Sequence, residues 1–310
     1  MQMEGGFGLI RIENVTKTYK SGKGIFDVSF SIQTGEVFGY LGPNGAGKTT
    51  TIRVLMGFLK ADQGNCSIDG LDCWTEQEKI QRDVGYIPGE IAFFQDMTGR
   101  EFLSLMNALR GTKAQKREKE LLDRFDLDPS GKIKRMSKGM KQKLGVVTAF
   151  MHDPKVYVLD EPTSGLDPLM QNEFIHLVHE EKKRGKTFLM SSHNFTEADR
   201  TSDRAGIIRE GKIMDVEDVR SLKARQKKVY LVSVAEDKDV ERMKDSSLEI
   251  GRISDHMIEI HVKDNYDEFL SELSQCRVLG IDVMAQGLEE AFLRYYGEVE
   301  EHHEHSTIQS

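Results

Sequence analysis

A glycine-rich stretch near the N-terminus, residues 42–50, constrains the fold of this chain more than any other feature. It reads Gly42-Pro43-Asn44-Gly45-Ala46-Gly47-Lys48-Thr49-Thr50. An apolar run typical of a buried strand precedes it (residues 37–41), and residues with helical spacing of apolar side chains follow it (51–56). Strand, glycine loop and helix form the context in which the pattern G-x-x-x-x-G-K-[ST] binds phosphate. Glycines let backbone N–H groups turn inward, and the start of a helix adds partial positive charge.

Two residues at the end of this loop carry the expected nucleotide chemistry. Lys48 is expected to reach the β- and γ-phosphates of a nucleotide, and the Thr49 hydroxyl is expected to ligate Mg²⁺. The whole of residues 42–50 is expected to surround the phosphates. A glycine-rich turn without a ligand is the simpler interpretation, but lysine and threonine in this register favour the phosphate site.

Length and charge exclude some classes of protein. The 310 residues allow one large or two moderate domains. A net charge of −8 and a pI of about 5.7 argue against a protein devoted to nucleic acid, so we expect no nucleic-acid partner. The three cysteines are too scattered for a disulfide framework or a zinc site, which favours reduced thiols in the cytosol.

The apolar runs are too short for a membrane span. The N-terminus lacks a basic region followed by an apolar stretch, so we expect no signal peptide. Runs such as residues 144–151 fall far below the ~20 residues that cross a bilayer. We expect that the chain does not enter a membrane by itself, although a partner can hold it there.

Two further apolar runs end in side chains suited to catalysis. Residues 156–159 lead into Asp160 and Glu161, and residues 187–192 lead into His193. Such runs suit parallel strands buried on both faces, and the carboxyl ends of parallel strands are where α/β sheets bind ligands. The three side chains are therefore expected at the same edge as the phosphate loop. With a charged helical insertion over residues 98–149, the pattern predicts a P-loop α/β fold with a helical subdomain.

Tyr19 precedes the phosphate loop and has two possible roles. Its ring could stack on the adenine of a bound nucleotide, as aromatic rings stack on bases generally. It could equally be a surface tyrosine on a hairpin. The residue alone does not decide between them.

The rhythm of strands and helices changes after residue 226. Residues 227–297 follow a β-α-β-β-α-β order, which predicts a small α+β domain of the ferredoxin-like type. Its last expected helix, residues 288–296, has an apolar face that either closes its own sheet or contacts a second subunit. Residues 298–310 contain several histidines, and we interpret them as a disordered tail rather than a metal site.

The order of these motifs resembles the ATP-binding subunit of ABC transporters. The resemblance covers residues 9–226. Ser137-Lys138-Gly139-Met140 is similar to the signature loop of the family and precedes a helix expected over residues 141–150. Ser164-Gly165-Leu166-Asp167 is similar to the D-loop of the family. Any one segment could occur by chance, but all of them in this order and spacing are specific to the family.

The resemblance implies a role for each matching residue. Asp160 would hold Mg²⁺ through water, Glu161 would polarise the attacking water, and His193 would contact the γ-phosphate of ATP. Ser137, with Gly139 and Asp167, would contact ATP bound to a second cassette, so that two copies close head to tail over two nucleotides. The simpler alternatives are carboxylates that cap the next helix and a structural histidine.

The chain departs from the family pattern in two places. Gly89 stands where the family has the glutamine of the Q-loop, with Glu90 next to it and Gln95 further on. We expect Glu90 to take over the link to the metal, and a solvated loop carboxylate is the alternative. Lys138 and Met140 replace the commoner glycine and glutamine, in a form similar to the exporter branch that handles bacteriocins, antibiotics and polysaccharides.

The resemblance implies the ATP-hydrolysing subunit of an exporter that energises a separate transmembrane permease. The expected cofactors are ATP and Mg²⁺, and the expected partners are the permease and a second, identical cassette. The chain would be peripheral, at the cytoplasmic face of the cell membrane. A soluble ABC ATPase acting on ribosomes or DNA is the alternative, but one uninterrupted cassette without sustained heptads favours the exporter. A P-loop nucleotide kinase would leave the signature and D-loop segments unexplained.

Overall fold

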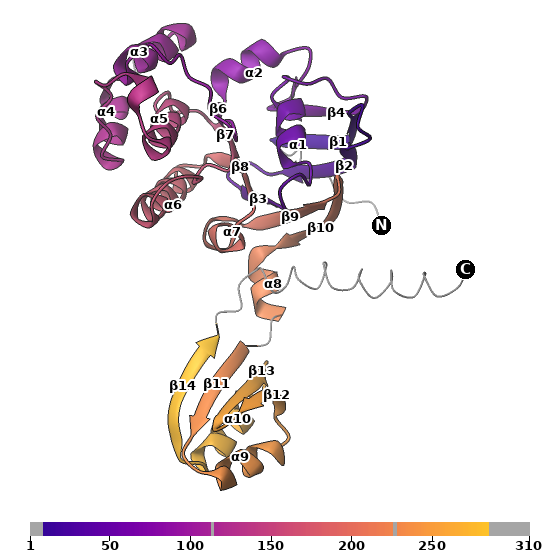
Figure 1. Cartoon of the computed structure of the whole chain (residues 1–310). Coiled ribbons are helices and arrows are strands. Elements are labelled where there is room, and N and C mark those ends of the chain that lie inside the picture. Colours follow the sequence, from indigo (N-terminus) through magenta and orange to yellow (C-terminus); the bar gives the residue numbers. More distant parts are fainter. Residues whose placement is uncertain (1–8, 113–114, 226–227, 285–310) are drawn as a thin grey trace. The chain divides into compact units, whose positions relative to one another are not determined.

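The computed structural model describes residues 9–112, 115–225 and 228–284 (Figure 1). The chain forms two compact units that divide between Asp218 and Val219. The first unit holds the phosphate loop and every motif discussed above up to His193. A domain boundary after residue 226 and the separate tail stay predictions.

A six-stranded sheet forms the centre of the first unit. Its strand order is β10-β9-β3-β8-β7-β6, and all neighbours pair in parallel except the edge pair β10–β9. The strands are β3 (Val37–Leu41), β6 (Gly85–Ile87), β7 (Val156–Asp160), β8 (Thr187–Ser192), β9 (Arg204–Arg209) and β10 (Lys212–Asp218). Every residue of β3, β7 and β8 is buried, as expected of parallel strands covered on both faces.

A second, antiparallel sheet packs beside the first one. Its order is β2-β1-β4-β5. The strands are β1 (Ile10–Thr18), β2 (Gly24–Ile32), β4 (Gln63–Ile68) and β5 (Leu71–Asp72). Figure 1 shows this sheet on one side of the six-stranded sheet, with helices α3 to α6 on the other.

Alternate side chains of the central strands feed two separate cores. Phe38 and Val158 belong to the core shared with β1, β2 and helix α1. Tyr157 and Phe188 point the other way, into the core shared with the helices, and their rings stack at 4.5 Å between centroids. This period of two explains why apolar side chains occupy both faces of these strands.

The helices of the first unit connect the strands and build a helical subdomain. They are α1 (Lys48–Leu55), α2 (Gln77–Asp83), α3 (Gly99–Arg110), α4 (Gln115–Arg124), the 3-10 turn η1 (Ile133–Arg135), α5 (Lys138–Phe150), α6 (Pro168–Lys183) and α7 (Phe195–Thr201). Helix α3 begins with a complete capping box between Thr98 and Glu101. The charged insertion is therefore helical, as the sequence predicted.

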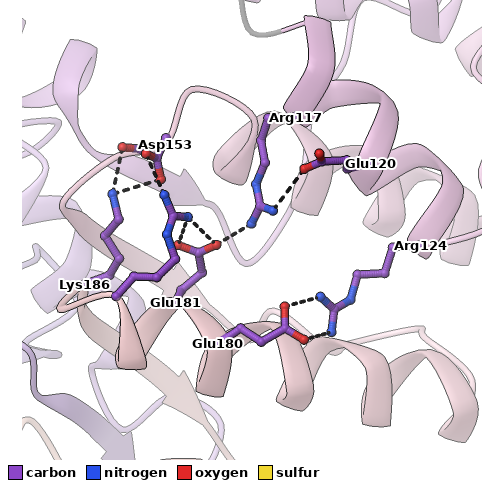
Figure 2. A network of polar contacts seen from close by, with 8 residues as sticks. Arg117, Glu120, Arg124, Asp153, Glu180, Glu181 and Lys186 are labelled. Carbon is purple, nitrogen blue, oxygen red and sulfur yellow. Dashed lines mark hydrogen bonds and ion pairs between the residues drawn. The ribbon is translucent and has the colours of Figure 1, made fainter.

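A cluster of ion pairs ties α4 to α6 (Figure 2). Arg117 on α4 pairs with the carboxylate of Glu181 on α6, which is only 1% exposed. Arg184 also pairs with Glu181, at 2.8 Å between Nη1 and Oε2. Arg124 reaches Glu180 with two hydrogen bonds, so the helical subdomain is held to α6 through two neighbouring glutamates.

The second unit has the strand order of a ferredoxin-like domain. After helix α8 (Val219–Arg225) come β11 (Lys228–Val234), α9 (Asp237–Lys244), β12 (Glu249–Ser254), β13 (Met257–Val262), α10 (Tyr266–Ser274) and β14 (Val278–Met284). The sheet is antiparallel with the order β12-β13-β11-β14. Side chains of α9 and α10, including Met243 and Phe269, share one core with β11 and β13. The predicted α+β unit is therefore confirmed.

Two expectations lie beyond what these elements can test. The helix expected over residues 288–296 and the histidine-rich tail lie outside the described residues. Among the residues that are described, no helix has both the length and the apolar character to cross a bilayer.

Candidate active site

The phosphate loop joins β3 to α1 and takes a shape that requires glycine. Gly45 and Gly47 have φ angles of 82° and 112°, in the region that side-chain-bearing residues avoid. A Cβ on Gly42 would lie 2.3 Å from the carbonyl oxygen of Ile208. Gly47 is the N-cap of α1 and offers no side-chain cap, so the first N–H groups of the helix are available to an anion.

Lys48 lies buried at the centre of the site. Its Nζ donates hydrogen bonds to the carbonyl oxygens of Gly42 and Pro43, at 2.6 and 3.2 Å, and lies 3.6 Å from Glu161 Oε1. Burial lowers the pKa of Lys48, and the carboxylates of Glu161 and Asp160 oppose that effect. The site therefore holds a cation in contact with Glu161 and within the electrostatic influence of Asp160.

Asp160 ends β7 and is held from two sides. The Thr49 hydroxyl donates to Asp160 Oδ2 at 2.7 Å, and the Ser191 hydroxyl donates to Oδ1. Asp160 is 1% exposed. Hydroxyl and carboxylate oxygens are the ligands that Mg²⁺ prefers, so Thr49 and Asp160 together fit that ion.

Glu161 follows directly and has a strained backbone. Its φ is 49°, in the left-handed region that costs a residue with a side chain about 1 kcal/mol or more. The N–H of Glu161 donates to the carbonyl oxygen and the hydroxyl of Ser191, at 3.2 and 3.1 Å. The carboxylate reaches His193, whose Nδ1 lies 3.2 Å from Glu161 Oε2. Ser191 in β8 and His193 just after it thus hold the segment that carries the Glu161 carboxylate.

A cavity of about 310 Å³ opens beside the phosphate loop. Tyr19 and Glu161 line it together with Lys48 and Thr49. The Tyr19 hydroxyl lies 3.4 Å from Thr50 Oγ1 and the residue is 38% exposed, so the tyrosine borders this site. Ser21, Lys23 and Gly24 also line the cavity, although no sequence motif pointed to them.

The signature and D-loop segments lie against each other, apart from this cavity. A Cβ on Gly139 would lie 2.9 Å from the carbonyl oxygen of Gly165. Ser137 Oγ accepts a hydrogen bond from the N–H of Met140, and Asp167 Oδ1 accepts one from Met170. None of the described residues that line the cavity belongs to these two segments.

The helix after the signature loop begins earlier than expected. The sequence suggested a start at Lys141, but α5 begins at Lys138 and Ser137 is its N-cap. The reason is the serine hydroxyl, which satisfies the N–H of Met140 and lets the helix extend back over the glycine.

The segment that departs from the family pattern lies beside Asp160. A Cβ on Gly89 would lie 2.9 Å from Asp160 Oδ2, so the backbone passes close to the carboxylate. Glu90 is exposed, and the described residues give it no hydrogen bond or ion pair. Gln95 Nε2 donates to the carbonyl oxygen of Phe93 at 3.3 Å. The role of Glu90 stays a prediction.

Two polar residues of the site had no assigned role in the sequence analysis. Ser191 bridges Asp160 and Glu161, and Gln142 on α5 donates to the carbonyl oxygen of Pro162 at 2.7 Å. Both are buried. A small polar residue within an apolar strand, next to two acidic ones, is the signal that could have pointed to Ser191.

Comparisons with known proteins agree with this geometry. The family model described as "ABC transporter" matches residues 25–164. An uncharacterised ABC transporter ATP-binding protein of Bacillus subtilis, YhcH, is 32% identical over 96% of this chain and 99% of its own length. The bacitracin transport ATP-binding protein BcrA of Bacillus licheniformis is also 32% identical, over 93% of this chain and 95% of its own length.

A solved structure of similar fold contains the products of ATP hydrolysis. The ATP-binding cassette MJ0796, as a dimer in a post-hydrolysis state with ADP and Pi, aligns with a TM-score of 0.61 and 25% identity. The alignment covers 68% of this chain and 99% of that one. The similarity to YhcH and BcrA extends over nearly the whole chain, and the phosphate loop, the acidic pair and the histidine gather at one sheet edge. The chain therefore belongs to the ABC transporter family, as an ATP-binding and ATP-hydrolysing cassette.

Proposed function

We propose that this protein is the ATP-hydrolysing subunit of an exporter and that it energises a separate transmembrane permease. The observation that carries the hydrolytic part is the meeting of Lys48, Asp160, Glu161 and His193 at the phosphate loop. The export part is supported by the relative named for bacitracin transport. The protein would be peripheral, held by the permease at the cytoplasmic face of the membrane.

The geometry supports a separate task for each side chain. Lys48 binds the β- and γ-phosphates, and its contact with Glu161 keeps the two groups at one point of the site. Glu161 orients the attacking water and accepts its proton, while His193 contacts the γ-phosphate. Tyr19 stacks on the adenine at the mouth of the cavity. Thr49 and Asp160 would hold Mg²⁺, which would supply positive charge to neutralise the phosphates.

A second copy of the chain would complete the site. Ser137, Gly139 and Asp167 lie away from the cavity of their own chain, and the start of α5 offers N–H groups to an anion. These residues would contact the ATP of the partner copy. The dimeric state of the MJ0796 cassette supports this arrangement.

Glu90 would link the metal edge to the permease. The close passage of Gly89 beside Asp160 supports this, because it brings the next side chain near the metal ligands. Glu90→Ala should then reduce permease-coupled ATPase more than basal ATPase. If Gln95→Ala has that effect and Glu90→Ala has none, Gln95 holds the role instead.

Residues 227–297 would form a domain that the cassette does not need for nucleotide binding. The strands from β11 to β14 share a core of their own, which supports this. A chain truncated after residue 226 should fold and bind ATP. A folded truncate with weakened ATP affinity would contradict the boundary.

Purification from membranes tests the exporter proposal. A tagged chain, extracted in mild detergent with ATP analogue present, should bring down a protein with about six membrane-spanning helices. Adding that protein in vesicles should raise ATPase activity. Recovery of ribosomal proteins or DNA in place of a membrane protein would favour the soluble alternative and contradict export.

A further inference from the structure

A second buried glutamate lies beside the proposed catalytic pair. Glu197 belongs to the first turn of α7 and is 7% exposed. The Ser192 hydroxyl donates to its Oε2 at 2.8 Å. The Thr163 hydroxyl also faces the carboxylate, but without a hydrogen bond of good geometry to the buried Oε1. Leaving a buried carboxylate oxygen unpaired is costly, so this residue needs an explanation.

The ionic surroundings of Glu197 are those of the active site. Burial raises the pKa of Glu197, and the charge of Glu161 adds to that effect. The hydroxyls of Ser192 and Thr163 and the side chain of His193 oppose it. The titratable groups that face Glu197 are therefore the two proposed catalytic residues, one attracting its charge and the other repelling it.

The contacts that begin at Glu197 fix the residues on either side of His193. Ser192, which Glu197 holds, accepts the N–H of Asn194 at 2.9 Å. Asn194 in turn caps α7 by accepting the N–H of Thr196 at 2.9 Å. The residues on both sides of His193 are thus fixed by one connected set of contacts that starts at the Glu197 carboxylate.

Glu197 also reaches the segment that carries the catalytic carboxylate. Thr163 lies two residues after Glu161, on the turn that leads to the D-loop. Glu197 thereby contacts both chain segments whose side chains meet at 3.2 Å, between His193 Nδ1 and Glu161 Oε2. No other described carboxylate is hydrogen-bonded to Ser192.

We propose that Glu197 is a positioning residue that sets the distance between His193 and Glu161 through Ser192 and Thr163. The inference rests on the roles proposed above for Glu161 and His193. A carboxylate suits this task because one oxygen accepts the hydrogen bond of Ser192 while the other faces Thr163, and its charge attracts the histidine. An amide of the same size accepts at one atom only and removes the charge.

The test is the full-length Glu197→Gln variant, measured for ATP hydrolysis, ATP affinity and thermal unfolding. Its kcat should fall roughly ten- to a hundredfold, as misplacement of a reacting group by about 1 Å does. The KM for ATP and the ATP affinity should stay unchanged, because the phosphate loop is untouched. Its Tm should not fall, since the variant removes a buried charge.

Ser192→Ala and Glu181→Gln make matched comparisons. Ser192→Ala breaks the same link and should lower kcat in the same direction without changing KM, and it decides the matter if Glu197→Gln fails to fold. Glu181→Gln removes a carboxylate buried in the ion-pair cluster of α4 and α6. It should lower the Tm and leave the kcat of the folded protein unchanged.

Two results would overturn the inference. One is an unchanged kcat in Glu197→Gln and Ser192→Ala. The other is a Glu197→Gln variant that behaves like Glu181→Gln, with a lower Tm and normal kcat, because that is the signature of a purely structural residue. Glu161→Gln separates this failure from a failure of the proposed function: normal turnover in that variant would overturn the function itself.

Discussion

Glu181 and Glu197 are both buried glutamates of the cassette, and their surroundings differ in kind. Glu181 meets two arginines, Arg117 and Arg184, and the cluster in Figure 2 extends from it to Asp153 and Lys186. Glu197 accepts a hydrogen bond from one well-placed hydroxyl, one of its oxygens lacks a hydrogen bond, and the charge of Glu161 lies close enough to oppose its ionisation.

The difference matches the division that we propose, between residues that stabilise the fold and residues that serve the reaction. Around Glu181 each buried charge has an opposite charge within reach, which is what a structural ion pair requires. Around Glu161 and Glu197 like charges lie near each other and the backbone of Glu161 is strained, at φ 49°. Such costs persist in proteins chiefly where function needs them.

The largest expected effect comes from Glu161→Gln, which removes the carboxylate that we propose as catalytic. Turnover should fall about 10²–10⁴-fold, the usual loss for a general base, while ATP affinity stays near normal. Steady-state ATPase and an ATP titration measure the two quantities. Glu210→Gln is the matched control, since Glu210 also has a positive φ, of 50°, but its side chain is 85% exposed. Equal losses in both variants would contradict the assignment.

Glu181→Gln tests the structural side of the comparison. It leaves Arg117 and Arg184 without their shared partner, and breaking a buried pair costs up to about 3–5 kcal/mol. Both arginines are partly exposed, at 26% and 47%, so the loss in unfolding free energy should lie at or below that range. Denaturant unfolding measures it. An unchanged midpoint would mean that the cluster does not stabilise the contact between α4 and α6.

Lys48→Ala should weaken ATP binding and hydrolysis together. A hydrogen bond to a charged group contributes about 1.5–3 kcal/mol, so the ATP Kd should rise roughly ten- to a hundredfold. Isothermal titration with ATP and Mg²⁺ gives the value. An unchanged ATP affinity would contradict the phosphate site. A weakened ATP affinity in Lys48→Ala beside a normal one in Glu161→Gln would assign binding to the lysine and hydrolysis to the glutamate.

The smallest effect is a dependence of stability on pH. The folded state raises the pKa of Glu197 above its ordinary value of 4.5, so folded protein binds this proton more tightly than unfolded protein. Its contribution to stability is present at low pH and is lost as pH rises from about 4.5 through the raised pKa. The Tm of Glu197→Gln relative to the unaltered protein should therefore increase between acid and neutral pH. A constant difference would contradict it.

The sequence predicted the parts of the site that short segments define. The phosphate loop, the buried run ending in Asp160 and Glu161, and the run ending in His193 each carry their own pattern, and parallel strand geometry brings their ends together. The ferredoxin-like order of β11 to β14 was also readable, because each element has a regular apolar period.

The contacts that orient the site were not readable in the same way. Ser191 and Gln142 bond to partners 20 residues or more away, and Glu197 bonds to a hydroxyl within a buried turn. Apart from the polar character of Ser191 in an apolar strand, nothing in their local sequence distinguishes them. The early start of α5 was missed for a related reason, since the hydroxyl of Ser137 decides it and the apolar pattern begins later. These hydrogen-bond partners and this helix start depend on tertiary packing, which cannot be read from short sequence segments.

One measurement tests the central claim that Glu161 drives hydrolysis in a pair of cassettes. Glu161→Gln is run on size exclusion with light scattering, with and without ATP and Mg²⁺, beside the unaltered protein. We expect the variant to shift from the mass of one 35.2 kDa chain to twice that mass when ATP is present, because hydrolysis is what opens the pair. A variant that binds ATP but stays at the mass of one chain, or that turns ATP over at a near-normal rate, would contradict the account.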